Sequence, residues 1–400
     1  MRHDLDRRRL LQGSTGLGLL GLGGCATAMS PPRAPGQTPL ASGVYRPVIA
    51  PVRADMRRVF DVTVCLRPFR AAGPRLDTER IGDALVVHNY GHGGSGWSLS
   101  WGSGTLAVRK AMANGPKEVA VIGCGAIGLT SAILAQEAGA RVTIYARDPL
   151  PDTRSARATG SWTPDSRIAL TKEAGPAFGA VWEDMARISY KRYRRYLGLP
   201  GTPVEWSDRY TLREEAPGTV KGPDDPLGFA SYEDRISDIM PHGETLSAAD
   251  NPFPVPHVRR GSAMQFNVAD LAHTLMSDFL TAGGRFEHRE FHSPAEFAAL
   301  KEKVVINCPG YGARALCRDE TITPVRGQIS WLIPQPEVNY GLFYNGVSVL
   351  SRRDGIVVQA VWGGDMMGYG DDQEVIDRAE TERSIRTIAE LYARMKPQAA

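Results

Sequence analysis

The segment that most constrains the fold is residues 118–148, E-V-A-V-I-G-C-G-A-I-G-L-T-S-A-I-L-A-Q-E-A-G-A-R-V-T-I-Y-A-R-D. A short apolar run leads into Gly123-x-Gly125-x-x-Gly128, an Ala- and Leu-rich stretch follows, and a second apolar run ends in Arg147-Asp148. This order predicts a strand–helix–strand unit that binds a dinucleotide. Its first glycine makes the turn, the second lets the backbone approach a pyrophosphate, and the third packs helix on strand. The fingerprint does not distinguish FAD from NAD.

A second glycine-rich stretch precedes this unit. Residues 88–104, H-N-Y-G-H-G-G-S-G-W-S-L-S-W-G-S-G, follow an apolar run at 84–88 and lead into small residues through 112. We therefore predict strand, glycine loop and helix, with backbone N–H groups and a positive helix end facing a ligand. Such a site suits a flavin, whose N1–C2=O edge becomes anionic on reduction. The alternative is a tight strand–helix connection without a ligand.

The remaining periodicity predicts a mixed α/β protein. Beyond the two glycine-rich units we expect helices at 175–197, 267–280 and 371–395. The strands expected are 204–206, 210–213, 285–288, 304–307, 325–333, 342–350 and 356–362.

The N-terminal residues resemble an export signal. Asp6 to Gln12 read D-R-R-R-L-L-Q, a mildly apolar run follows, and L-G-G-C ends at Cys25. This pattern predicts a twin-arginine (Tat) signal over 1–25, with Cys25 lipidated and the mature protein attached to the membrane in the periplasm. The alternative is a plain export signal cut elsewhere. Residues 26–58 are Pro-rich and are expected to form a tether.

Bulk composition excludes several classes of protein. The chain has 400 residues, 42% hydrophobic and 23% charged, with a net charge of +3. No long basic block is present, so nucleic-acid binding is not expected. Beyond Cys25 the four cysteines (Cys65, Cys124, Cys308, Cys317) make no CxxC pair or metal spacing, so no metal is expected. We interpret them as small buried hydrophobes, with disulfides as the alternative.

Four segments of the chain resemble the D-amino-acid oxidase family of FAD enzymes. They are V-I-G-C-G-A-I-G with I-Y-A-R-D and G-S-W-T-P (121–164), V-V-I-N-C-P-G-Y-G-A-R-A-L (304–316), P-V-R-G-Q (324–328), and L-R-P-F-R with H-N-Y-G-H-G-G (66–102). The resemblance implies a Rossmann-like FAD-binding domain and an α+β substrate domain with a mixed sheet. We expect the FAD-binding domain at 59–170 and 267–325, and the substrate domain at 171–266 and 326–400.

The order of these motifs differs from that of the family. Family members carry Arg-Pro-x-Arg and HNYGHGG near their C-termini, whereas here the pair precedes Gly123 and the chain stops after the expected final helix. Residues 118–395 followed by 60–113 would restore the family order. We therefore interpret the chain as circularly permuted, with 113–117 as the fused linker.

The resemblance implies the following contacts. Gly123, Cys124, Gly125, Ile127 and Gly128 would hold the pyrophosphate, Arg147 and Asp148 the adenosine ribose, and Phe291 the adenine. Arg154, Ser155, Gly160 and Ser161 would lie under the flavin, and Gly93, Gly94, Ser95, Gly96, Trp97 and Ser98 at the isoalloxazine edge.

Arg70, in R-P-F-R, is expected to bind the substrate carboxylate, because a guanidinium fork fits a carboxylate in a bidentate manner. Arg67 is expected to be structural, and His88 and His92 to structure the loop. Gly94 is placed at the substrate. The position where the family carries a tyrosine over the substrate holds Ser348, and Tyr344 or Tyr340 are the candidates to replace it.

The expected function is oxidation of D-amino acids by hydride transfer from Cα to flavin N5. Dioxygen then reoxidises the flavin, so that an imino or keto acid, ammonia and hydrogen peroxide result. No catalytic side chain is required. The alternatives are a glycine, amine or D-aspartate oxidase, a dehydrogenase, and a flavin-binding lipoprotein without turnover.

Overall fold

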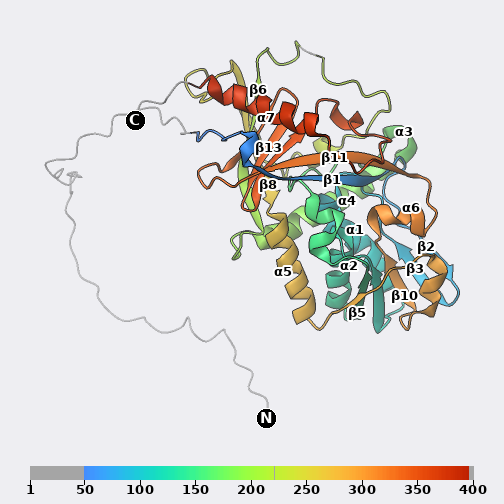
Figure 1. Ribbon diagram of the computed structural model, residues 1–400. Coiled ribbons are helices and arrows are strands. Elements are labelled where there is room, and N and C mark those ends of the chain that lie inside the picture. Colours follow the sequence, from blue (N-terminus) through green and yellow to red (C-terminus); the bar gives the residue numbers. More distant parts are fainter. Residues whose placement is uncertain (1–48, 220, 396–400) are drawn as a thin grey trace, which may run out of the picture. The chain divides into compact units, whose positions relative to one another are not determined.

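The computed structural model describes residues 49–395 except residue 220. All the elements below belong to one compact unit and form two sheets with helices packed against them (Figure 1). The expected signal peptide with Cys25 lies outside the described residues. Within these residues, no helix is both long and apolar enough to cross a bilayer.

A six-stranded sheet carries the dinucleotide fingerprint. Its order is β2-β3-β10-β4-β5-β9, and only β2 runs antiparallel to its neighbour. The chain leaves β4 on one side toward β5, while β10 and β3 lie on the other side, so a topological switch point falls at β4. The strands are β2 (Thr78–Ile81), β3 (Ala84–His88), β4 (Glu118–Ile122), β5 (Arg141–Ala146), β9 (Arg285–His288) and β10 (Val304–Asn307).

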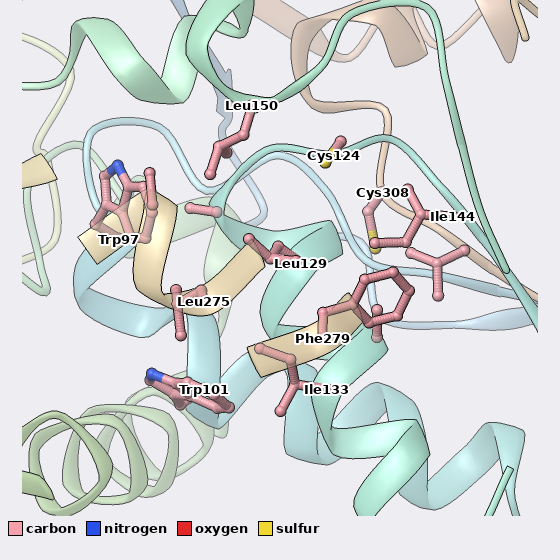
Figure 2. Packing of buried hydrophobic residues seen from close by; sticks show 14 of the residues in the cluster. Trp97, Trp101, Cys124, Leu129, Ile133, Ile144, Leu150, Leu275, Phe279 and Cys308 are labelled. Atoms are coloured by element: carbon pink, nitrogen blue, oxygen red, sulfur yellow. The ribbon is translucent and has the colours of Figure 1, made fainter. Parts of the chain in front are cut away.

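Apolar helices bury one face of this sheet. The core there joins Leu129, Ile133 and Cys308 with Trp101 and Phe279 (Figure 2). Small residues let the helices approach closely, since a Cβ at Gly102 of α1 would lie 2.1 Å from the Met185 carbonyl oxygen of α4. The helices are α1 (Gly96–Ala111), α2 (Ala126–Glu137), α4 (Phe178–Tyr193) and α5 (Val268–Thr281), and the short helices are α3 (Thr171–Ala174) and α6 (Ala313–Leu316).

An eight-stranded mixed sheet forms the other half. Its order is β1-β11-β14-β13-β12-β6-β8-β7. Helix α7 (Arg378–Ala393) covers one face through Ile385, Ile388 and Leu391 (Figure 1). The strands are β1 (Val59–Arg70), β6 (Val204–Arg213), β7 (Glu244–Thr245), β8 (His257–Phe266), β11 (Ile322–Leu332), β12 (Tyr340–Tyr344), β13 (Val347–Arg352) and β14 (Gly355–Ala360). The expected division into two domains stays a prediction.

Several expected boundaries are wrong. The single strand expected at 342–350 is the hairpin β12–β13, because Asn345 and Gly346 adopt φ of +44° and +71°, as a two-residue turn requires. Strands expected at 204–206 and 210–213 are one strand, β6. Helix α7 begins seven residues later than expected, where the Asp377 carboxylate accepts a hydrogen bond from the Glu380 amide.

The segment expected as a tether also ends earlier. From Ile49 onward the chain packs on the protein: Ile49 and Val52 are buried beside α7, and the Tyr340 hydroxyl donates to the Ala50 carbonyl (2.7 Å). Residues 49–58 are therefore part of the fold. Only 26–48 keep the tether interpretation, and they lie outside the described residues.

The four described cysteines are free thiols. Cys124 and Cys308 are buried, and burial raises the pKa of each thiol to about 12. Both therefore behave as the small buried hydrophobes predicted from the sequence, whereas Cys65 and Cys317 are only partly buried.

Candidate functional site

Three glycine-containing loops meet at one edge of the six-stranded sheet. They follow β3, β10 and β4, which are adjacent and parallel, so their carboxyl ends share this edge. The loops begin at Asn89, Cys308 and Gly123 and read N-Y-G-H-G-G-S, C-P-G-Y-G and G-C-G. The two glycine-rich stretches of the sequence therefore lie side by side, at the place where open α/β sheets bind ligands.

Helix α2 begins at the fingerprint, and its N-cap residue, Gly125, has no side chain to cap it. Gly123 has φ +95°, and a Cβ at Gly128 would lie 2.0 Å from the Gly123 carbonyl oxygen. Gly128 thus sets the close packing of helix on strand and lines neither cavity described below. The Ala126 amide donates to Ser155 Oγ (3.0 Å). The next amides of the first turn have no partner within the helix, so they are available to a phosphate.

Helix α1 also begins without a side-chain cap in the described chain. The amides of Gly93, Gly94 and Ser95 donate to the carbonyl groups of Pro68, Ser166 and His92, at 2.8–2.9 Å. These three amides fix the loop, which corrects the expectation that they face the flavin edge. The amides of the first turn of α1, residues 96–98, are the ones left for a ligand.

Two cavities open at these helix starts and join. Their volumes are about 160 and 370 Å³. Six residues line both: Ala126, Ile127, Arg154, Ser155, Gly310 and Tyr311. The two cavities therefore form one elongated site that passes the start of α2.

The cavity at α1, called the α1 cavity below, has a glycine-rich wall. Of the residues expected at the flavin, it is lined by Gly93, Gly94, Gly96, Trp97, Ser98, Arg154, Ser155, Gly160 and Ser161. Ser95 does not line it, because its hydroxyl donates to the Ser166 carbonyl (3.0 Å). The Trp97 indole N–H donates to the Ser155 carbonyl (2.8 Å), which ties α1 to the loop on the opposite wall.

The second cavity, at β5, has polar and aromatic walls. Gly123, Cys124, Gly125, Ile127, Arg147, Asp148 and Phe291 line it, as expected for the adenosine half of a dinucleotide. Arg147 pairs with Asp148 (2.8 Å) and Glu290 (3.3 Å), and hydrogen bonds from Arg147 lower the pKa of the Asp148 carboxyl. The Phe291 ring packs edge-on against Tyr145.

The two arginines of R-P-F-R point in opposite directions. Arg67 lines the α1 cavity, whereas Arg70 does not. Arg70 donates to Thr321 Oγ1 and to the Gly73 carbonyl (2.9 Å each) and lies 3.5 Å from Asp319. Arg70 therefore does not lie where the sequence analysis expects it, at the substrate carboxylate. The strand alternates faces, so residues three apart cannot share one.

The Arg67 guanidinium lies flat over Gly327 of β11. A Cβ at Gly327 would lie 2.3–2.6 Å from its terminal atoms, so the guanidinium can take this position only over a glycine. Among the described residues its side-chain hydrogen bond goes to the Arg326 carbonyl (3.1 Å), from Nη1. The rest of the fork is free to meet an anion in the cavity.

The tyrosines expected over the substrate point elsewhere. The Tyr344 hydroxyl donates to Glu214 (2.6 Å), and the Tyr340 hydroxyl bonds Ala50 and Tyr392, all on the α7 side of the sheet. Both belong to the α7 core, so Tyr344 is not at the substrate. Ser348 lines neither cavity.

Both loop histidines are structural, as predicted. His88 bonds Glu79 through Nε2 (3.0 Å) and Asn307 through Nδ1 (3.1 Å). His92 is buried and lies 2.7 Å from Ser103 Oγ, and burial lowers its pKa to about 3. His92 is therefore neutral at physiological pH.

Several lining residues escaped the sequence analysis. Gly310 and Tyr311 follow β10, and the rule that ligands bind beyond strand ends could have indicated them. Gly327 and Ile329 of β11 and Arg157 also line the α1 cavity, but the sequence gives no local signal for them. In the described chain, no group of three or more His, Cys, Asp or Glu side chains is arranged to hold a metal.

A comparison with protein families matches the part of the chain that begins with β4. The model of the FAD dependent oxidoreductase family (DAO) matches residues 118–400. The chain belongs to this family. The family implies FAD as cofactor, and the joined cavities fit it: the first turn of α2 would hold the pyrophosphate, the cavity at β5 the adenosine, and the α1 cavity the isoalloxazine.

Curated relatives are similar in sequence to part of this DAO-family chain. A D-amino-acid oxidase of Rubrobacter xylanophilus is 31% identical over 210 residues, covering 52% of this chain and 57% of the relative. One of Streptomyces coelicolor is 32% identical over 216 residues, covering 53% and 58%. The chain thus spans little more than half the length of the curated relatives it matches.

Solved structures align more distantly. An L-amino acid deaminase from Proteus vulgaris, lacking its specific insertion sequence, aligns with a TM-score of 0.47 at 14% identity, covering 70% of this chain and 76% of the other. Glycine oxidase from Geobacillus kaustophilus aligns with a TM-score of 0.44 at 13% identity, covering 70% and 78%.

Proposed function

We propose that the protein is an FAD-dependent oxidase of D-amino acids in which Arg67 binds the substrate carboxylate. The observation that carries this proposal is the Arg67 guanidinium, spread over Gly327 on the wall of the α1 cavity with most of its donors free. The names of the two curated relatives support the substrate class.

The chain's part in the reaction is binding and orientation. Arg67 donates two hydrogen bonds to the carboxylate and so fixes the orientation of Cα in the cavity. The first-turn amides of α1 and the positive end of that helix stabilise negative charge that develops beside them. When bound, FAD supplies the hydride acceptor.

No side chain of the α1 cavity is needed as a general base. His92 lines this cavity, but its pKa near 3 and its contact with Ser103 make it a weak base engaged in the loop. The substrate amine therefore has to enter neutral, or lose its proton to water, before Cα is oxidised. We expect the rate of reduction to follow the ionisation of the amine.

The pair Arg67 and Arg70 gives the decisive experiment. In Arg67→Met, FAD should stay bound, while the substrate concentration for half-maximal flavin reduction rises about a hundredfold or more, because charge-assisted hydrogen bonds are lost. Arg70→Met should keep the wild-type value and lose stability instead, since Arg70 ties Thr321, Gly73 and Asp319 together. Anaerobic bleaching of flavin absorbance with a panel of D-amino acids measures both.

Two results would contradict the proposal. Equal loss in both variants would mean that the motif acts through folding alone, and loss confined to Arg70→Met would return the role to Arg70. Peroxide release during aerobic turnover distinguishes an oxidase from a dehydrogenase, and a flavin that no amino acid or amine bleaches would leave only a binding protein.

A further inference from the structure

Arg209, on β6, is a buried cation that the proposed reaction does not use. Its Nε and Nη2 atoms are closed to solvent and have no hydrogen-bond partner among the described residues. The side chain as a whole keeps some accessible surface. A buried charge without a partner is costly, so such a group normally meets an anion.

The charge of Arg209 is not offset by a described neighbour. Burial alone lowers its pKa to about 10, and no acidic side chain opposes that shift. The guanidinium is nevertheless charged at physiological pH. By contrast, the buried Arg352 of β13 pairs with Asp354 and donates to the Ala158 carbonyl (2.7 Å). Of these two buried arginines, Arg352 therefore has an acidic partner, and Arg209 has none among the described residues.

Strand register places Arg209 on the same sheet face as the α1 cavity. Arg209 pairs with Gly341, Gly341 with Leu350, and Leu350 with Val357. Leu350 and Val357 pack with Ile329, which lines the cavity. Helix α7 covers the opposite face.

The side chain crosses a position that only glycine leaves free. A Cβ at Gly341 would lie 2.7 Å from Arg209 Nη1 and 2.9 Å from Cδ. The guanidinium is therefore directed over β12 toward β13. Phe343, two residues along β12 on the same face, is 38% exposed, so solvent reaches this face next to Gly341.

We propose that Arg209 anchors a carboxylate-binding site on this face of the sheet, separate from the site at Arg67. A planar fork with free Nε and Nη2 favours a carboxylate over a compact anion, because two donors can meet two oxygens. Strand β6 lies five strands from β1 in the sheet order, roughly 24 Å at about 4.8 Å per strand. The guanidinium groups are closer together than these strands, because that of Arg209 lies over β12 and that of Arg67 lies over β11. A short amino acid cannot reach both arginines.

The carboxylate can come from two sources. It is either a free small carboxylate or the distal carboxylate of an extended substrate whose α-carboxylate sits at Arg67. The second source rests on the proposed function, whereas the first does not. Two probes distinguish these sources: a free dicarboxylate, and a pair of substrates of which only one carries a distal carboxylate.

The first arm measures succinate binding by calorimetry. The FAD-loaded protein carries Arg67→Met, so that carboxylate binding at Arg67 does not contribute. We expect saturable one-to-one binding that weakens about tenfold or more when Arg209→Met is added. Gly341→Ala should weaken it as well, because the added methyl displaces the guanidinium, and it keeps the arginine if Arg209→Met fails to fold.

The matched control is Arg260→Met. Arg260 lies on the neighbouring strand β8, pairs with Glu244, and is opposite Tyr210, which belongs to the α7 core. The substitution removes the same charge from the other face and should leave succinate binding unchanged. Equal weakening by Arg260→Met would mean that only net charge matters and would overturn the site.

The second arm compares N6-succinyl-D-lysine with N6-butyryl-D-lysine in otherwise wild-type protein. A lower KM for the succinyl compound that disappears in Arg209→Met identifies the substrate's own carboxylate. Loss of succinate binding with an unchanged KM ratio identifies a free anion. If neither probe distinguishes Arg209→Met from its parent, Arg209 binds no carboxylate and the inference is wrong.

Discussion

At the scale of single residues, the site depends on which face of a strand a side chain occupies. Arg67 and Arg70 are three residues apart on β1, so the alternation of the strand turns their side chains to opposite faces, and Arg67 is the one that lines the α1 cavity. The sequence contains this constraint but does not say which arginine is inside. That depends on β1 pairing with β11, where Gly327 makes room for Arg67.

Asp165 provides a residue-scale prediction about pH. Burial, and the nearby charges of Glu233 and Asp365, raise its pKa from 3.8 to about 6. Because the folded pKa exceeds the unfolded one, the wild type loses stability as pH rises from about 4 through 6. Asp165→Asn should therefore be more stable than wild type above pH 6, by up to about 3 kcal/mol, with the gain vanishing below pH 4.

Urea unfolding of both proteins between pH 4 and pH 8 measures this difference. Asparagine keeps an oxygen that can accept from the Tyr232 amide, which lies 3.4 Å from the carboxylate. A stability difference that does not change with pH would show that the ionisation of Asp165 is not involved.

At the scale of elements, the strand–helix–strand unit was predictable because its residues interact locally. Glycine turn, helix and second strand are consecutive, and each agrees with its local pattern. Strand β1 was not predicted, because Pro68 within it argues against a strand. The proline is tolerated because β1 is the edge strand of its sheet. The β12–β13 turn was missed although N-G at 345–346 is a hairpin signal.

The loop that leads into α1 gives an element-scale prediction. Gly93 has φ +55°, and a Cβ there would lie 1.8 Å from the Arg167 carbonyl oxygen. Gly93→Ala should therefore destabilise the protein by more than the roughly 1–3 kcal/mol of backbone strain alone and weaken FAD binding. Thermal unfolding and the flavin content of the purified protein measure the two effects.

Gly96→Ala is the matched control in the same loop. Its φ is not positive, and no described atom lies within 4 Å of a Cβ there. Alanine at the first position of α1 should leave the stability of the apoprotein unchanged or raise it by up to about 1 kcal/mol. Equal destabilisation by both substitutions would mean that packing against Arg167 is not the cause.

At the scale of the whole molecule, the geometry of the site does not depend on the order of the motifs along the chain. The loop after β3 lies beside the fingerprint loop although it comes first in the chain, because β3 and β4 both pair with β10. The family match begins at residue 118, where β4 begins, and leaves this loop outside. We propose that the chain is a circular permutation of the family order.

The contacts of the structure support this proposal. Met395, after α7, packs in the same core as Val52 and Met56, so a short connection can join these segments. Residues 113–115, between α1 and β4, are exposed and can be cut without removing a core contact. A chain that runs from Lys117 to Met395 and continues with Ile49 to Asn114 should therefore keep every element described here.

This rearranged chain is expected to bind FAD and to show the same substrate panel as the native order. Packing is indifferent to chain order when the joined ends are close, so its stability should differ only through changed loop closure, by about 1–2 kcal/mol. Flavin absorbance and anaerobic bleaching with D-amino acids measure the outcome. A control chain that is joined at the same place but opened inside β4, between Ala120 and Val121, should not bind FAD, because the cut divides a buried central strand. If the rearranged chain also fails to bind FAD, the native order is itself required for the fold, and the relation to the family is not a simple permutation.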